Sequence, residues 1–305
     1  MAQNDLTQRV ARKQSTPPND THYLRSWHLH NHYQHPWVDP RSSSRCEEAW
    51  QLLNGYGSAD VVIAITDDGC RLDHGDFNQS KFANWGYFKA NRLVTSTDPD
   101  AVAANMYQSG SNHGTSCAGV AAGEADGVLT VGAAPGCRLL PIKWESDDTA
   151  LYVTDSKLRK ALDWIADKAD VMSNSWGMVP DQLFGAIVTD RIRQLSTSGG
   201  RRGRGIVFLW AAGNEDCPIE HNGAIDIPYS GGWKYTSTGK TWIGVDTSRR
   251  FRNTLVPIPG VMHIAALAST AQRSHYSNYG TGIDLCAPSS NSHAFWRMTV
   301  NGLGV

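Results

Sequence analysis

Residues 61–69 read Val-Val-Ile-Ala-Ile-Thr-Asp-Asp-Gly, an apolar run that ends in two acids and a glycine. A short continuous apolar run followed by a turn signal is typical of a central strand buried on both faces of a parallel sheet. Asp-Gly pairs also favour plain turns, so this motif alone does not establish a site. A carboxylate at the carboxyl end of such a strand nevertheless lies where α/β sheets bind ligands.

The remaining pattern alternates strands with helices. Apolar spacing predicts further strands at 138–143, 171–175, 205–212 and 262–269, and helices at 42–53, 155–168 and 182–195. Ser44 and Glu47 are expected to form a capping box at the first helix. Strands that alternate with helices predict a three-layer αβα fold around a central, mostly parallel sheet.

The domain organisation follows from the segments that lack this alternation. Residues 1–40 contain four prolines and no periodic pattern, which predicts an extended N-terminal arm. Residues 41–305 are then expected to form one α/β domain. Within it, residues 216–260 are rich in Gly, Pro, Thr and Ser and are expected to form a surface insertion.

Composition limits the expected partners and location. The chain has 305 residues, 28 Lys plus Arg against 29 Asp plus Glu, and 40% hydrophobic residues. This balance gives no reason to expect nucleic acid or a membrane surface as partner, and it does not fix the oligomeric state. Residues 1–14 lack a signal-peptide pattern, so a cytoplasmic location is expected by default, or secretion if an export signal is missing from the sequence.

Two residue patterns have simple structural interpretations. The six cysteines show no Cys-x-x-Cys spacing and are expected to be free thiols. The basic run Arg201-Arg202-Gly-Arg204 follows a predicted helix, where cations offset the negative end of the helix dipole.

Three polar residues stand at the ends of predicted elements. Asp67 ends the first strand, His113 begins a stretch of small residues, and Asn214 follows the strand at 205–212. Each taken alone is more commonly a turn residue or a structural histidine. An acid, a histidine and an amide donor at one sheet edge are together the parts of an acyl-transfer site. The order Asp, His, then a later Ser is one of the known triad orders.

These motifs resemble the subtilase family, and within it the kexin and furin branch and its bacterial relatives. The similarity extends from about Pro18 to Pro288. It rests on Asp67-Asp-Gly69, His113-Gly-Thr-Ser-Cys-Ala-Gly119, Ser173-Asn-Ser-Trp-Gly177, Pro18-Asn-Asp20 with Trp27-His-Leu29, Tyr276-Ser-Asn-Tyr-Gly280 and Asp284-Leu-Cys-Ala-Pro288.

The resemblance implies a serine endopeptidase that acts on peptide or protein substrates without an organic cofactor. Asp67 would orient His113, which would be the general base and then the general acid. Asn214 would donate a hydrogen bond to the oxyanion. The remaining implied residues would bind the substrate, mainly by pairing with an extended peptide strand: Ser175, Trp176, Gly177, Ala212 and Gly213.

The nucleophile of this family follows the Ala-Pro pair by some twenty or more residues, in a Gly-Thr-Ser-x-x-x-Pro segment. Here Pro288 is followed by residues 289–305, and Ser289, Ser290 and Ser292 are not preceded by Gly-Thr. We therefore expect the nucleophile to lie beyond residue 305 and the 305-residue chain to be inactive. The alternatives are a peptide-binding pseudopeptidase and one half of a split enzyme.

The resemblance also implies structural calcium. Its expected ligands are the side chains of Asp20, Asp76 and Asp126 and the carbonyls of Val128 and Thr130, an oxygen set of the kind that calcium prefers. The alternative is that these acids are solvated loop residues.

Two further hypotheses concern metal binding and specificity. Residues 28–35 contain His-x-His spacing that can bind zinc, but no buried strand precedes it, so an arm packed by Trp27 and Leu29 with exposed histidines is expected. The kexin branch cleaves after basic residues, which suggests a preference for Arg or Lys. Candidate pocket acids are Asp181, Asp216, Glu220 and Asp226.

Overall fold

A single eight-stranded sheet runs through the molecule. The computed structural model describes residues 17–289, apart from 148–149, 179–180, 223–226, 237–238 and 249. The strand order is β10-β9-β6-β5-β1-β4-β2-β3, and every neighbouring pair is parallel except β2 with β3. The strands are β1 Val62–Asp67, β2 Gly86–Lys89, β3 Arg92–Thr95, β4 Arg138–Lys143, β5 Val171–Asn174, β6 Val207–Ala211, β9 Val261–Leu267 and β10 Leu285–Pro288.

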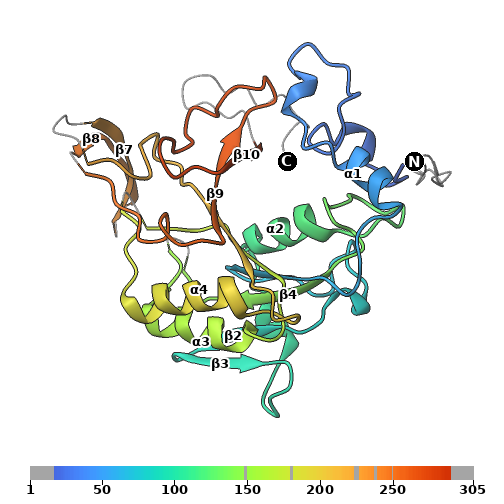
Figure 1. Cartoon of the computed structure of the whole chain (residues 1–305), viewed down its shortest axis with the longest axis horizontal. Coiled ribbons are helices and arrows are strands. Elements are labelled where there is room, and N and C mark those ends of the chain that lie inside the picture. Colours follow the sequence, from blue (N-terminus) through green and yellow to red (C-terminus); the bar gives the residue numbers. More distant parts are fainter. Residues whose placement is uncertain are drawn as a thin grey trace, which may run out of the picture.

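Helices cover both faces of this sheet (Figure 1). They are α2 His113–Ala122 on one face and α3 Asp155–Ile165 and α4 Ala186–Ser198 on the other, whereas α1 Cys46–Leu53 packs with the N-terminal arm. Alternate residues of β1 explain the two layers: Val62 and Ala64 join the core beneath α3 and α4, whereas Ile65 joins the core beneath α2. The three-layer fold with a mostly parallel sheet is therefore confirmed.

Small side chains allow α2 to approach the sheet closely. Ala118 and Ala122 are fully buried and pack in one cluster with Ile65 of β1 and Leu139 of β4. Such close packing places the first residue of the helix near the carboxyl end of β1. None of the helices in the described ranges has the length and apolar character needed to cross a bilayer.

The expected capping box at α1 is wrong. The helix begins at Cys46, after Arg45 with φ of 56°, and its N-cap makes no side-chain hydrogen bond. The Ser44 hydroxyl instead donates to the carbonyl of His28, and the Glu47 carboxylate accepts from the Tyr23 hydroxyl. Both side chains are used to fasten the N-terminal arm, and this long-range pairing displaces the local one.

The other two predicted helices also have different bounds in the structure. α3 ends at Ile165, three residues early, and α4 begins at Ala186 rather than at residue 182. The backbone of Gln182 donates to the Arg252 carbonyl at 2.7 Å and accepts from Thr254 at 2.9 Å. These bonds hold residue 182 beside a distant segment, which explains why the helix starts later.

The described part of the N-terminal arm, residues 17–40, is packed rather than free. It contains two short 3₁₀ turns, Tyr23–Arg25 and Pro40–Ser42, and buries Tyr23, Trp27 and Leu29. The expectation of exposed histidines is wrong for His30, which is 1% exposed and whose Nε2 lies 3.1 Å from the Tyr23 carbonyl oxygen. Its ring stacks on that of His32, with 3.9 Å between ring centroids.

Residues 216–260 divide into parts with different environments. β7 Ile227–Thr236 and β8 Gly239–Ser248 pair as a separate antiparallel hairpin at the rim of the molecule (Figure 1). By contrast, Phe251, Leu255 and Ile258 are almost completely buried. The segment after the hairpin therefore contributes to the main core and is not part of a surface insertion.

The core beneath α3 and α4 predicts a large response to truncation. Leu162 is fully buried among α3, α4 and the sheet, so Leu162→Ala is expected to lower the free energy of unfolding by about 2–5 kcal/mol. Leu53→Ala is the matched control, since Leu53 is 69% exposed, and should change it by less than about 0.5 kcal/mol. Denaturant titration measures both, and equal effects would contradict the assigned core.

Candidate active site

A buried carboxylate at the end of β1 forms the base of the site. Asp67 is 2% exposed. Its oxygens lie 2.8 and 3.0 Å from Nδ1 of His113, and Oδ1 also accepts from the backbone N–H of Asp68 at 2.8 Å. A buried charge needs such partners, because desolvation alone would penalise the charged form.

The first turn of α2 is held by a second carboxylate. Asp68 accepts hydrogen bonds from the backbone N–H groups of His113 at 3.2 Å and of Gly114 at 2.7 Å. The N-cap residue, Asn112, makes no side-chain bond, so Asp68 replaces it from another element. An acid is favourable at this end of a helix. This role was not predicted, although the doubled acid at 67–68 was a visible signal.

Gly114 is required for β1 and α2 to approach each other. A Cβ at this position would lie 2.1 Å from the Gly69 carbonyl oxygen and 2.7 Å from the Cβ of Asp67. Both separations are far inside van der Waals contact. Any larger residue would therefore move the start of α2, and His113 with it, away from Asp67.

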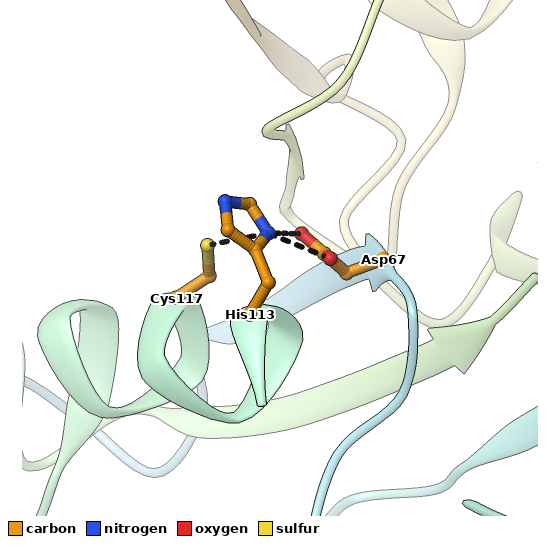
Figure 2. Close-up of side chains that lie close together, drawn as sticks. All are labelled: Asp67, His113 and Cys117. Carbon is orange, nitrogen blue, oxygen red and sulfur yellow. Dashed lines mark hydrogen bonds and ion pairs between the residues drawn. The ribbon is translucent and has the colours of Figure 1, made fainter. Parts of the chain in front are cut away.

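The charge of Asp67 influences the protonation of the His113 imidazole. The hydrogen bond to the Asp67 carboxylate, followed by the nearby Cys117, raises the pKa of His113 well above its ordinary value. The same carboxylate favours a proton on Nδ1, and Figure 2 shows the other ring nitrogen pointing away from Asp67. That nitrogen is accessible from solvent, since the His113 side chain is 60% exposed.

A hollow adjoins this pair and contains the predicted substrate edge. Ser175, Trp176 and Gly177 line it together with Asp67 and His113. The other lining residues are Asp68, Asp147, Ala150, Leu151, Val153, Asp155, Met178 and Phe184. The structure thus brings together residues from β1, α2 and the segment after β5.

Trp176 is fixed by its neighbours. Its Nε1–H donates to Oγ1 of Thr66 at 2.8 Å, and its carbonyl accepts from Nε1 of Trp210 at 2.9 Å. Thr66 in turn donates to Oδ1 of Asn174 at 2.7 Å. These bonds make the Trp176 carbonyl an occupied acceptor and the backbone around it a rigid edge.

The predicted oxyanion residue lies at the same sheet edge but outside the lining of the hollow. Asn214 is exposed and follows β6, two strands away from β1. Ala212 and Gly213 precede it, and neither lines the hollow. The Asn214 backbone N–H donates to Oε2 of Glu215 at 2.9 Å. Burial raises the pKa of the Glu215 carboxyl.

Asn278 organises this loop. Its side-chain amide donates to the Ala212 carbonyl at 3.0 Å and to Oε2 of Glu215 at 2.7 Å. Its Oδ1 accepts from the backbone of Glu215 and of Cys217 at 3.0 and 3.1 Å. Asn278 is 3% exposed. The sequence motif at 276–280 pointed to this segment but gave no role to its asparagine.

The predicted calcium residues gather where the arm meets two loops. The backbone N–H groups of Asp126 and Gly127 both donate to Oδ1 of Asp20 at 3.2 Å. Oδ2 of Asp76 accepts from the Thr130 hydroxyl at 2.8 Å, and Oδ1 of Asp126 accepts from the backbone N–H of Val128 at 3.0 Å. Segments around residues 20, 76 and 126–130 are therefore neighbours.

One carboxylate oxygen at this junction, Oδ2 of Asp20, has no hydrogen-bond donor in the described ranges to stabilise its charge. Asp20 is 4% exposed, and its Oδ2 is buried with no hydrogen-bond partner. Burial raises the pKa of this carboxyl. Among the described residues, Asp20, Asp76 and Asp126 do not form a cluster of ligand atoms within 4.8 Å of one another. The orphaned oxygen fits a cation, which would compensate the buried charge.

The candidate specificity acids lie elsewhere. Asp181 pairs with Arg252 at 2.9 Å and Asp216 with Arg273 at 2.8 Å, and neither lines the hollow. Glu220 is exposed and Asp226 lies outside the described residues. The acids that do line it, besides Asp67 and Asp68, are Asp147 and Asp155. Sequence spacing carried no signal for these two.

Comparisons with known proteins identify the family of the chain. A family model described as "Subtilase family" matches residues 58–303. A "Calcium-dependent protease" from Trichormus variabilis is 31% identical over 81% of the chain, and human "Proprotein convertase subtilisin/kexin type 5" is 32% identical over 69%. The chain spans only 32% and 11% of these relatives.

The fold also matches solved structures. A serine protease of Aeromonas sobria has a TM-score of 0.63 at 19% identity, with 95% of this chain and 48% of that chain covered. A protease from Pseudoalteromonas arctica has a TM-score of 0.58 at 23% identity, with 90% and 73% covered. At these identities the likeness concerns the fold alone.

The Asp67–His113 bond predicts a shift in titration. Asp67→Asn is expected to lower the pKa of His113, because the amide removes the charge that favours the imidazolium. Proton NMR of the histidine ring across a pH series measures it. Asp73→Asn is the control, since Asp73 is 82% exposed and pairs with Arg71, and should leave the His113 pKa unchanged. An unchanged pKa in Asp67→Asn would refute the pairing.

Proposed function

The chain belongs to the subtilase family, and we propose that it supplies the acid, base and substrate edge of a serine endopeptidase. The observation that carries the proposal is the 2.8 Å bond between Asp67 and His113 beside a hollow lined by Ser175–Gly177. A buried carboxylate that orients a histidine at the edge of a groove is the arrangement needed for base-assisted attack on a carbonyl.

The geometry suggests a role for each group. With Nδ1–H directed to Asp67, Nε2 of His113 accepts the proton of the attacking hydroxyl and later returns it to the leaving amine. Asp67 stabilises the imidazolium formed between these steps. Asn214 supplies an amide donor for the oxyanion, and Asn278 positions its loop through the bonds to residues 212–217.

The attacking hydroxyl is proposed to belong to a serine C-terminal to residue 305. Support comes from the family's Gly-Thr-Ser-x-x-x-Pro segment, which does not occur after Pro288 in this sequence. The chain of residues 1–305 would then bind substrate without forming an acyl-enzyme.

The substrate is proposed to be an extended peptide. The Trp176 carbonyl already accepts a hydrogen bond from Trp210. The backbone groups of Ser175 and Gly177 would therefore form the hydrogen bonds with a substrate strand. Asp147 and Asp155 add negative charge to the lining of the hollow, which supports a preference for peptides with Arg or Lys.

A fluorophosphonate probe, which reacts with activated serines, tests this function. The protein expressed from the full reading frame is expected to be labelled at a serine beyond residue 305 and to cleave internally quenched peptides. His113→Ala should lower kcat by several orders of magnitude, whereas His35→Ala, a half-buried position of the arm that does not line the hollow, should have no effect.

The outcomes separate the alternatives. Labelling of a serine within residues 1–305 would overturn the proposed position of the nucleophile. Peptide binding without labelling or cleavage by the full-length protein would favour a pseudopeptidase. Cleavage after Leu or Phe but not after Arg would refute only the basic preference.

Calcium is proposed as a structural ion. The support is the buried, unpartnered Oδ2 of Asp20 and a relative named "Calcium-dependent protease". Asp20, Asp76 and Asp126 would hold the ion with the carbonyls of Val128 and Thr130, and the ion would supply positive charge that fastens the arm to the two loops. The chemistry of peptide cleavage does not pass through this site.

Thermal unfolding with and without calcium tests this site. Calcium is expected to stabilise the chain by about 2.7 kcal/mol at a concentration 100 times its dissociation constant. Asp20→Asn should remove most of this gain, because the amide keeps the shape but loses the charge. Asp100→Asn is the control, since Asp100 is exposed. A calcium response that survives Asp20→Asn would contradict the assignment.

A further inference from the structure

Cys117 lies beside the catalytic pair and has no role in the proposed mechanism. Ligand atoms of Asp67, His113 and Cys117 all lie within 4.8 Å of one another, the only such group of three or more in the described part of the chain. Figure 2 shows the carboxylate and the thiol converging on Nδ1 of His113 from β1 and α2. We propose that these three side chains bind one zinc-like divalent cation and thereby switch off the catalytic histidine.

The spacing of the donor atoms fits a tetrahedral ion. Cys117 follows His113 by one helical turn, so both side chains stand on the same face of α2. Nδ1 lies 2.8 Å from Oδ1 of Asp67 and 3.8 Å from Sγ of Cys117. Ordinary zinc bond lengths at tetrahedral angles separate nitrogen from oxygen by about 3.4 Å and nitrogen from sulfur by about 3.6 Å. Small side-chain rotations therefore suffice.

The charges and donor types select the ion. A carboxylate and a thiolate together neutralise two positive charges, and imidazole completes a mixed O, N, S set that suits zinc rather than calcium. On binding, the thiol and Nδ1 each lose a proton, and the neutral imidazole then carries its one remaining proton on Nε2. Because the His113 side chain is 60% exposed, a water molecule could supply the fourth ligand.

The other cysteines offer no equivalent among the described residues. Cys70, Cys137 and Cys217 are buried, and burial raises the pKa of Cys70 and Cys217 to about 12. Cys46 is half-buried like Cys117, but its Sγ lies 3.2 Å from the Ser44 hydroxyl and it belongs to no three-ligand group. It therefore supplies a matched control.

Binding would have a direct chemical consequence. A cation on Nδ1 replaces the proton that is hydrogen-bonded to Asp67. Nε2 then carries the one remaining proton and cannot accept a second proton from an attacking hydroxyl. This inhibition rests on the proposed function, whereas the binding itself does not. Free zinc would then inhibit the peptidase activity, and removal of the zinc would restore it.

Cobalt(II) serves as the probe, because thiolate ligation gives a near-ultraviolet charge-transfer band and tetrahedral ligation gives strong visible absorption. The purified 305-residue chain, saturated with calcium, is titrated with Co²⁺ and then with Zn²⁺. We expect both signals at one Co²⁺ per chain and their loss on addition of Zn²⁺. Cys46→Ser should behave like the unmodified chain.

Two variants test the ligands separately. Cys117→Ser should abolish the charge-transfer band and weaken Co²⁺ binding more than 10-fold, since even outer-shell partners are worth about 10–100-fold. Asp67→Asn should weaken binding but keep the thiolate band at saturation. A band that persists in Cys117→Ser, or Co²⁺ affinity unchanged in both variants, would overturn the proposal. Because peptidase activity is not measured, these outcomes are independent of the nucleophile.

Discussion

The cost of burying the Asp67 carboxylate governs the arrangement around it. A charge removed from water must be compensated, and here the partners are the imidazole of His113 and a backbone N–H. The imidazole can reach it only if the first turn of α2 touches the end of β1. Gly114 makes that contact possible because any Cβ would collide with Gly69. A local requirement for pairing thus sets the position of a whole helix.

The contact between β1 and α2 depends both on the small residues of α2 and on Asp68. Ala118 and Ala122 let the helix lie close to the sheet, and Asp68 satisfies the N–H groups exposed at its start. The strand and the small-residue stretch after His113 were recognised from local patterns, whereas Asp67 was paired with His113, 46 positions away, only through the family resemblance. The cap from Asp68 was not found, because that bond joins residues 45 or more positions apart.

The predicted starts of α1 and α4 were wrong for a similar reason, because long-range hydrogen bonds override local sequence patterns. Ser44 and Glu47 have the spacing of a capping box, yet both bind the arm. Residue 182 has helical periodicity, yet its backbone pairs with residues 252 and 254. In each case a tertiary bond replaced the local one that the pattern predicts. Asp147 and Asp155, which line the hollow, were missed for the same reason, since only the fold brings them near Asp67 and His113.

The position of Cys117 also follows from the geometry that serves Asp67 and His113. A helix that begins at His113 necessarily presents its fifth residue one turn above, on the same face. A thiol at that position faces the same nitrogen that the carboxylate engages. A serine there would keep the size but lose the soft donor that zinc favours. The Asp67–His113 bond that favours a proton on Nδ1 therefore also provides two of the three donors of the proposed metal site, and the side chain at position 117 decides whether a metal ion can compete with that proton.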